Sequence, residues 1–173
     1  IYAASDAIQS MGIPWETVVS AVRPDQISVY ASSAMAQLDE NGNGGLLSAR
    51  FDGRRVTSKQ VALGLADMPS DFVNAYVLGN VGNTGPSLGA CATFLYNLRL
   101  GVQDIRSGRA RVAVIGASEA PITPDVIDGY ATMGALATDA GMMKLDGVSA
   151  LDEAAYRRVC RPFGENCGFT LAE

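Results

Sequence analysis

The sequence contains no histidine, only three cysteines, and fewer basic than acidic residues, 13 against 18. Without histidine, and with Cys160 and Cys167 seven positions apart, a zinc site has little support and no metal is expected. The net charge of −5 argues against nucleic acid as a partner, because binding of phosphates needs a basic face. An odd number of cysteines without framework spacing favours a reducing compartment, so we expect a cytoplasmic protein.

Long apolar runs are also missing. No stretch approaches the length of a bilayer span and no signal peptide is visible, so no membrane partner is expected. The 173 residues are 48% hydrophobic and 18% charged, a composition typical of a globular domain. The sequence begins with Ile1 rather than methionine, and residues 1–12 already have a helical pattern, so we expect an interior segment of a larger protein.

Helical and extended patterns alternate along the chain, which predicts an α/β fold. The predicted elements are a helix at 3–11 closed by Gly12, a helix beginning at Pro14, a strand at 26–31, a helix carried by 64–72, a loop at 141–150 and a short helix at 151–159. The continuous apolar run at 112–116 is typical of a strand buried on both faces.

Residues 39–44 imitate a calcium-binding loop, because their side chains fit the first ligand positions of an EF-hand. The twelfth position should be a bidentate glutamate, but it is Arg50, and a cation there opposes the binding of another cation. We therefore predict an ordinary loop without calcium.

A stretch dense in small residues, 82–93, contains Cys91 and ends where a helical pattern begins. This places Cys91 at or near a helix N-terminus, where unpaired N–H groups favour a thiolate and can hold an oxyanion of an acyl intermediate. The neighbouring glycines favour a tight turn around an exposed nucleophile. The alternative is a small buried cysteine that packs the helix onto a sheet.

The helix after Cys91 is predicted from Thr93 onward. Its large apolar side chains recur at helical spacing and form a single stripe, made of Leu95, Leu98, Val102 and Ile105. Arg106 places a cation in the last turn, and Gly108 stands where a left-handed cap would end the helix.

Several short motifs, taken in order, resemble the β-ketoacyl-[acyl-carrier-protein] synthases, the condensing enzymes of fatty-acid synthesis. The block Gly-Ala-Cys-Ala-Thr at 89–93 resembles their active-site block. The other matching segments are 68–74, 114–119, 130–138, Arg161-Pro162-Phe163, and Gly168-Phe169 with Glu173. One departure is that Gly85-Pro86-Ser87 stands three residues closer to the cysteine than in the family, so the local turn can differ.

The resemblance implies a thiolase-like layered αβαβα fold. Residues 1–173 would form part of a β-ketoacyl synthase domain, mostly its N-terminal half, without the first strand and the C-terminal half. It further implies that Cys91 takes up an acyl group, which then undergoes decarboxylative Claisen condensation with malonyl carrier protein. The two histidines that serve this second step in relatives would lie outside these residues, so the segment alone is expected not to condense anything. No cofactor is implied.

The resemblance also implies partners and substrate contacts. The partners are acyl carrier protein, loaded with acyl or malonyl groups, and a second copy in a homodimer. Tyr130 stands where relatives have an aromatic residue of the acyl pocket, although a mere core role stays open; Met35 lies in a small-residue turn near the acyl chain, and Ala92 is beside the nucleophile. The open alternatives are a thiolase or other acyltransferase of this fold, a non-condensing scaffold homologue, and a polyketide pathway instead of fatty-acid synthesis.

Overall fold

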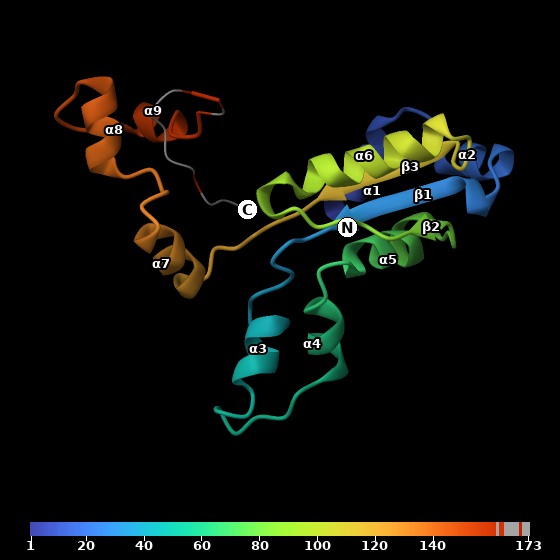
Figure 1. Ribbon diagram of the computed structural model, residues 1–173, viewed down its shortest axis with the longest axis horizontal. Coiled ribbons are helices and arrows are strands. Elements are labelled where there is room, and N and C mark those ends of the chain that lie inside the picture. Colours follow the sequence, from blue (N-terminus) through green and yellow to red (C-terminus); the bar gives the residue numbers. More distant parts are fainter. Residues whose placement is uncertain (162, 165–169, 171–173) are drawn as a thin grey trace. The chain divides into compact units, whose positions relative to one another are not determined.

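The computed structural model describes residues 1–161, 163, 164 and 170, and the chain divides into two compact units, Ile1–Glu119 and Ala120–Glu173 (Figure 1). Most of the final family-like motif, including Pro162, Gly168, Phe169 and Glu173, lies outside the described residues, as does Cys167. None of the described helices has the length and apolar character needed to cross a membrane.

The first unit is built on a parallel sheet with the strand order β2-β1-β3. The central strand β1 (Ile27–Ser32) pairs along its whole length with β3 (Val112–Ala117), and β2 (Asn83–Thr84) adds a short pairing on the other side. The strands expected at 26–31 and 112–116 are therefore confirmed. The burial expected for the strand at 112–116 is wrong: β3 is an edge strand of this sheet and is only half-buried. The strand that is buried almost throughout is β1.

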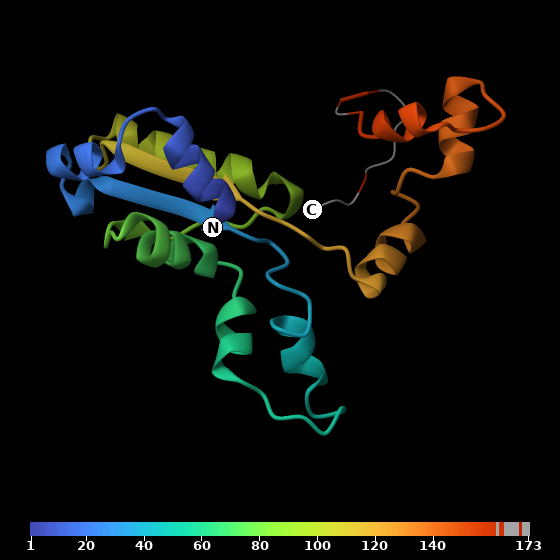
Figure 2. The same ribbon diagram turned by 180° about the vertical axis from the view of Figure 1, so that it is seen from behind.

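The two faces of the sheet carry different chemistry, since neighbouring residues of a strand point to opposite sides. On one face Val29 packs with Val73 and Leu78 in an apolar core, which α1 (Tyr2–Ser10) and α5 (Met68–Val73) help to cover. On the other face Ser28, Tyr30 and Ser32 lie under α6 (Thr93–Arg106). Figure 2 shows α6 running along β3 and α5 along β1.

Helix α6 has the predicted bounds, and Gly108 adopts the predicted left-handed conformation with φ +73°. Its orientation is the opposite of what its apolar stripe indicates. The buried side chains are Thr93, Asn97, Gly101 and Asp104, whereas the stripe of Leu95, Leu98, Val102 and Ile105 is 38% to 63% exposed. The reason is that the central strand β1 presents two serines and a tyrosine, which hydrogen-bond to the polar side of the helix.

The chain before the sheet follows the prediction. Helix α1 ends before Gly12, which has φ +71°, and α2 (Trp15–Ala21) begins directly after Pro14. The indole N–H of Trp15 donates a hydrogen bond of 3.0 Å to the carbonyl of Leu78, which ties α2 to the apolar face. A short 3-10 turn, Pro24–Gln26, leads into β1.

Two expectations between β1 and β2 need correction. Residues 64–72 do not form one helix: α4 (Ser58–Leu63) ends before Gly64, and α5 begins anew at Met68. A capping box of Thr57 and Gln60 sets the start of α4. The loop expected at 39–44 is a turn only as far as Gly42, because α3 (Asn43–Ser48) already begins at the next residue.

The second unit contains α7 (Pro124–Thr132), α8 (Asp139–Asp146) and α9 (Glu153–Arg157). The short helix expected at 151–159 is confirmed by α9. The loop expected at 141–150 is wrong, because α8 occupies more than half of that range, residues 141–146. The hydroxyl of Thr138 accepts a hydrogen bond of 3.2 Å from the Gly141 N–H and caps the helix, which runs to Gly147, with φ +67°.

Candidate active site

Cys91 lies in a 3-10 turn, Ala90–Ala92, that leads directly into α6 at Thr93. The position expected from the sequence, at a helix N-terminus, is therefore confirmed. Its thiol is free and its side chain is exposed, which does not fit the alternative of a buried cysteine packing the helix onto the sheet. An exposed thiol beside the first N–H groups of a helix can react with an electrophile from solution.

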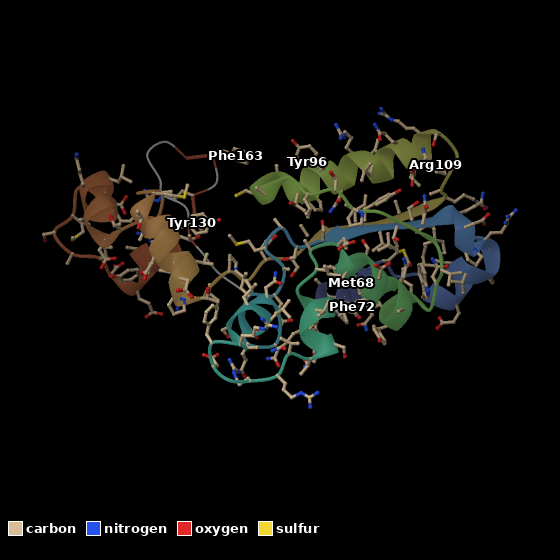
Figure 3. The ribbon with its side chains drawn as sticks, turned by 60° about the horizontal axis from the view of Figure 1, so that its bottom comes forward. Met68, Phe72, Tyr96, Arg109, Tyr130 and Phe163 are labelled. Carbon is tan, nitrogen blue, oxygen red and sulfur yellow. The ribbon has the colours of Figure 1, made fainter. Side chains whose placement is uncertain are left out.

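The turn before Cys91 has the backbone that its small residues allow. Ala90 adopts a left-handed conformation with φ +48°, which costs a residue with a side chain about 1 to 2 kcal/mol. Gly89 lies against the ring of Tyr96, and a Cβ atom at Gly89 would stand 2.1 Å from the Cδ2 atom of that ring. The glycine is thus needed for close approach to Tyr96, whose place on α6 is shown in Figure 3.

The side chain of Thr93 hydrogen-bonds to the backbone of the same turn. Its buried hydroxyl accepts a hydrogen bond of 3.1 Å from the N–H of Gly89 and donates one of 2.7 Å to the carbonyl of Ala90. The N–H of Ala92 donates to the carbonyl of Gly89 at 2.9 Å. These bonds hold the strained residue Ala90 from both sides, so the cysteine has a defined place at the start of the helix.

Asn97, one turn further along α6, connects the helix to the sheet. Its amide group donates to the hydroxyl of Ser32 at 2.9 Å and to the carbonyl of Gly116 at 3.1 Å, while its oxygen accepts from the N–H of Ser87 at 2.8 Å. The turn that carries Cys91 is thereby attached to the carboxyl ends of β1 and β3. Sequence reasoning missed this residue, since an asparagine inside a helical pattern gives no signal of its own.

The predicted contact residue Met35 lies in the turn that follows β1, and it is half-buried. The carboxylate of Glu119 holds this turn: it accepts hydrogen bonds from the hydroxyl of Ser33 at 3.1 Å, from the N–H of Met35 at 3.4 Å, and from the N–H of Ala34. The sequence showed Glu119 only as the last residue of a family-like motif. The sequence does not predict that its carboxylate binds the turn after β1.

The other predicted contact residues have different settings. Ala92 is half-buried in the same turn as Cys91. Tyr130 is half-buried on α7 and belongs to the second unit (Figure 3). Met35, Ala92 and Cys91 all lie in the first unit. The contacts of Met35, Ala92 and Tyr130 with the acyl chain stay predictions.

The polar face under α6 also contains a buried carboxylate, Asp104. It accepts hydrogen bonds from the hydroxyls of Ser28 at 2.6 Å and Tyr30 at 2.5 Å, and Arg109 lies 3.2 Å away. Burial alone raises the pKa of Asp104, but the two hydrogen bonds and the guanidinium outweigh it, so the pKa lies below the usual range of aspartate. Burial, followed by the bond to Asp104, raises the pKa of the Tyr30 hydroxyl.

Among the described residues, no three acidic, histidine or cysteine side chains stand close enough together to hold a metal ion. In the region that imitates a calcium loop, the carboxylate of Asp39 accepts hydrogen bonds from the Asn41 N–H at 2.9 Å and the Gln37 amide at 2.8 Å. This carboxylate organises a turn within its own segment.

Comparison with known proteins gives concordant matches. The family model described as "Beta-ketoacyl synthase, N-terminal domain" matches residues 1–171. The Beta-ketoacyl-[acyl-carrier-protein] synthase FabY of Pseudomonas aeruginosa is 57% identical over 173 residues, which are 100% of this chain and 27% of that protein. The crystal structure of the ketosynthase FabY from the same organism has a TM-score of 0.85 and 57% identity over 96% of this chain and 26% of that chain. The chain thus spans about a quarter of the length of this relative.

Proposed function

Because the chain belongs to the β-ketoacyl synthase family and has its thiolase-like fold, we propose that it carries the acyl-accepting nucleophile of a 3-oxoacyl-[acyl-carrier-protein] synthase of fatty-acid synthesis. One observation carries the proposal. The exposed Cys91 stands on a strained turn at the N-terminus of α6, and hydrogen bonds tie this turn to the ends of two parallel strands. Ligands of open parallel sheets bind at this edge.

In the first step the thiolate of Cys91 attacks the carbonyl carbon of an acyl thioester on acyl carrier protein. The bond from that carbon to the carrier's sulfur breaks, and the acyl group stays on Cys91 as a thioester. The carrier leaves as a thiolate and takes up the proton that the thiol of Cys91 released. Backbone N–H groups and the dipole at the start of α6 would help to stabilise the oxyanion that forms on the way. The family resemblance adds a second backbone donor to the oxyanion, from a part of the fold that lies after residue 173.

In the second step malonyl carrier protein loses carbon dioxide, and the carbanion equivalent that results attacks the acyl group. A carbon–carbon bond forms, and the bond from the acyl carbon to the sulfur of Cys91 breaks. The family resemblance assigns the stabilisation of the decarboxylating thioester to two histidines. Residues 1–173 contain none, so this step requires groups from elsewhere in the full-length protein.

The remaining parts of the proposal concern substrate and partners. Met35, Ala92 and Tyr130 would contact the acyl chain; the first two lie in turns of the same unit as Cys91, which supports their assignment. The carrier would be acyl carrier protein, as the name of the matching relative indicates. We further propose a homodimer that works in the cytoplasm, in keeping with a family of fatty-acid synthesis.

The first experiment is intact-mass analysis and peptide mapping of the full-length protein, mixed with acyl carrier protein that bears a short acyl chain. We expect one acyl adduct, confined to the Cys91 peptide and absent in Cys91→Ala. Cys160→Ala is the matched control, because Cys160 is also a free, exposed cysteine but lies outside the turn, and this variant should be acylated normally. An adduct on Cys160, or none in a folded protein, would contradict the assignment and favour a scaffold homologue.

A second measurement separates a condensing enzyme from a thiolase of the same fold. The acylated protein is supplied with malonyl carrier protein labelled isotopically in its free carboxyl group. A synthase should release one labelled carbon dioxide for each 3-oxoacyl product. Formation of product from an acetyl thioester alone, without release of label, would indicate a thiolase instead.

A further inference from the structure

Asn97 is buried to an extent that is unusual for an amide side chain. It is 0% exposed, and its amide nitrogen and oxygen make three hydrogen bonds to three different segments of the chain. Packing of a helix on a sheet does not need such a group, because burial of an amide is unfavourable unless each donor and acceptor is paired. Gly101, one turn later on the same face, shows that a small residue suffices for close approach.

The bonds of Asn97 form part of a closed ring. Its oxygen accepts from the N–H of Ser87, the carbonyl of Ser87 accepts from the hydroxyl of Ser32 at 3.3 Å, and that hydroxyl accepts from the Asn97 amide. The ring therefore engages both polar backbone groups of Ser87, its N–H and its carbonyl, and leaves Asn97 one further donor, which bonds to the carbonyl of Gly116. A side chain on α6 thus fixes a piece of backbone that lies outside the helix.

The ring joins two residues that stand on either side of Cys91 in the sequence. Ser87 precedes Cys91 by four residues and Asn97 follows it by six, so the ring ties together the two ends of the segment that carries the thiol. Within the segment Ala90 is strained at φ +48°, and a strained residue persists only where its surroundings determine it. Without the ring, the stretch from Ser87 to Cys91 loses its attachment to β1 and β3.

We propose that Asn97 is a positioning residue for Cys91: through Ser87 and Ser32 it fixes the turn that presents the thiol at the start of α6. The proposal rests on the role of Cys91 given above. Asn97 touches neither substrate nor the reacting sulfur, and it acts by keeping the turn in register with the strand ends. A displacement of about 1 Å at a reacting group can cost on the order of a hundredfold in rate, so a loss of this register has a measurable effect.

The test compares Asn97→Ala and Ser32→Ala with Asn74→Ala in the full-length protein. Asn74 is the matched control, since it is a buried asparagine of the same unit that lies outside the ring; its amide oxygen accepts a hydrogen bond from the Asn80 amide at 3.4 Å. Three quantities are measured: the unfolding midpoint, the rate of alkylation of the Cys91 peptide by iodoacetamide as a function of pH, and kcat and KM for acylation by acyl carrier protein.

Asn97→Ala should slow the alkylation of Cys91 about tenfold or more, shift its pH profile, and lower kcat of acylation with little change in KM. Ser32→Ala should act in the same direction but less strongly. The double variant should behave as Asn97→Ala alone, because both residues belong to one ring. Asn74→Ala should lower the unfolding midpoint and leave the profile of Cys91 unchanged.

The proposal is overturned if Asn97→Ala and Ser32→Ala lower the unfolding midpoint while the alkylation profile of Cys91 coincides with that of the unchanged protein. If Asn97→Ala does not fold, the profile of Ser32→Ala decides by the same criterion. Failure of the unchanged protein to accept an acyl group would contradict the proposed function. The positioning role of Asn97 would still be tested by the alkylation rates, because alkylation needs no acyl donor.

Discussion

Asp104 is a buried carboxylate on the helix that follows Cys91, and its charge is balanced by groups from two other segments. Ser28 and Tyr30 reach it from β1, and Arg109 from beyond the end of α6 (Figure 3). A buried charge stabilises a fold only where it is fully hydrogen-bonded, and removal of one partner leaves the others unsatisfied. Asp104 therefore fastens the second half of α6 to the sheet, as Asn97 fastens the first half.

The lowered pKa of Asp104 predicts how its contribution to stability depends on pH. Since the folded protein binds the proton more weakly than the unfolded chain, whose aspartates titrate near about 3.9, the stabilisation is present above that pH and is lost as the pH falls through the folded value. Asp104→Asn should lower the free energy of unfolding by about 1.5 to 3 kcal/mol at pH 7 and flatten its decline in acid. Denaturant titrations near pH 7 and near pH 3 measure both effects.

Asp25→Asn is the control for this prediction, because the pair of Asp25 and Arg23 is exposed, and such pairs contribute little. It should change the unfolding free energy only slightly at either pH. The interpretation of Asp104 is wrong if Asp104→Asn loses stability on acidification as steeply as the unchanged protein.

At the scale of residues, the sequence predicts features that depend on neighbouring residues, but not contacts between residues far apart in the chain. The place of Cys91 could be predicted, because the small residues before it and the helical period after it are neighbours in the chain. The roles of Asn97, Asp104 and Glu119 could not, since their partners on or just after β1 lie 65, 76 and 85 positions away. Only the parallel register of β1 and β3 brings these side chains together.

At the scale of elements, the bounds of α6 were predicted correctly, but the side of the helix that packs on the sheet was not. Periodicity finds the apolar side of a helix, but it does not say which side meets the neighbouring strand. Here the strand offers Ser28, Tyr30 and Ser32, so the polar side of α6 is the one that packs on it. Gly101 allows the close approach, because a Cβ atom there would meet Ile115 Cδ1 at 2.5 Å.

Gly101→Val is therefore expected to push α6 away from β3. The gain in helix propensity over glycine is less than about 1 kcal/mol, whereas overpacking against Ile115 and Ala113 costs about 1 to 3 kcal/mol, so the clash should win. Thermal unfolding and Cys91 alkylation of the full-length protein measure the loss of stability and any shift of the helix start. Gly129→Val is the matched control, since no atom lies within 4 Å of a Cβ at this position in α7; an equal loss in both variants would refute the packing argument.

At the scale of the molecule, the outer side of α6 is an apolar surface that nothing in the first unit covers. Leu95, Leu98, Val102 and Ile105 are exposed on it. The family fold is layered, and the chain spans about a quarter of the relative FabY, so we expect this side of α6 to be covered by further layers of the same domain in the full-length protein. The sequence led to the fold class through its motifs, whereas the period of the stripe alone does not say what packs against it.

Leu98→Glu in the full-length protein tests this expectation. On a helix face that stays in water, such a substitution changes stability by less than about 0.5 kcal/mol, whereas a charge forced into an apolar interface costs several times more. We expect a loss above about 2 kcal/mol in denaturant titrations, or failure of the protein to fold. Gln103→Glu introduces the same side chain at an exposed polar position of α6 and should be nearly neutral. If both variants prove equally harmless, the apolar side of α6 faces solvent in the whole protein, and the layer expected above it lies elsewhere.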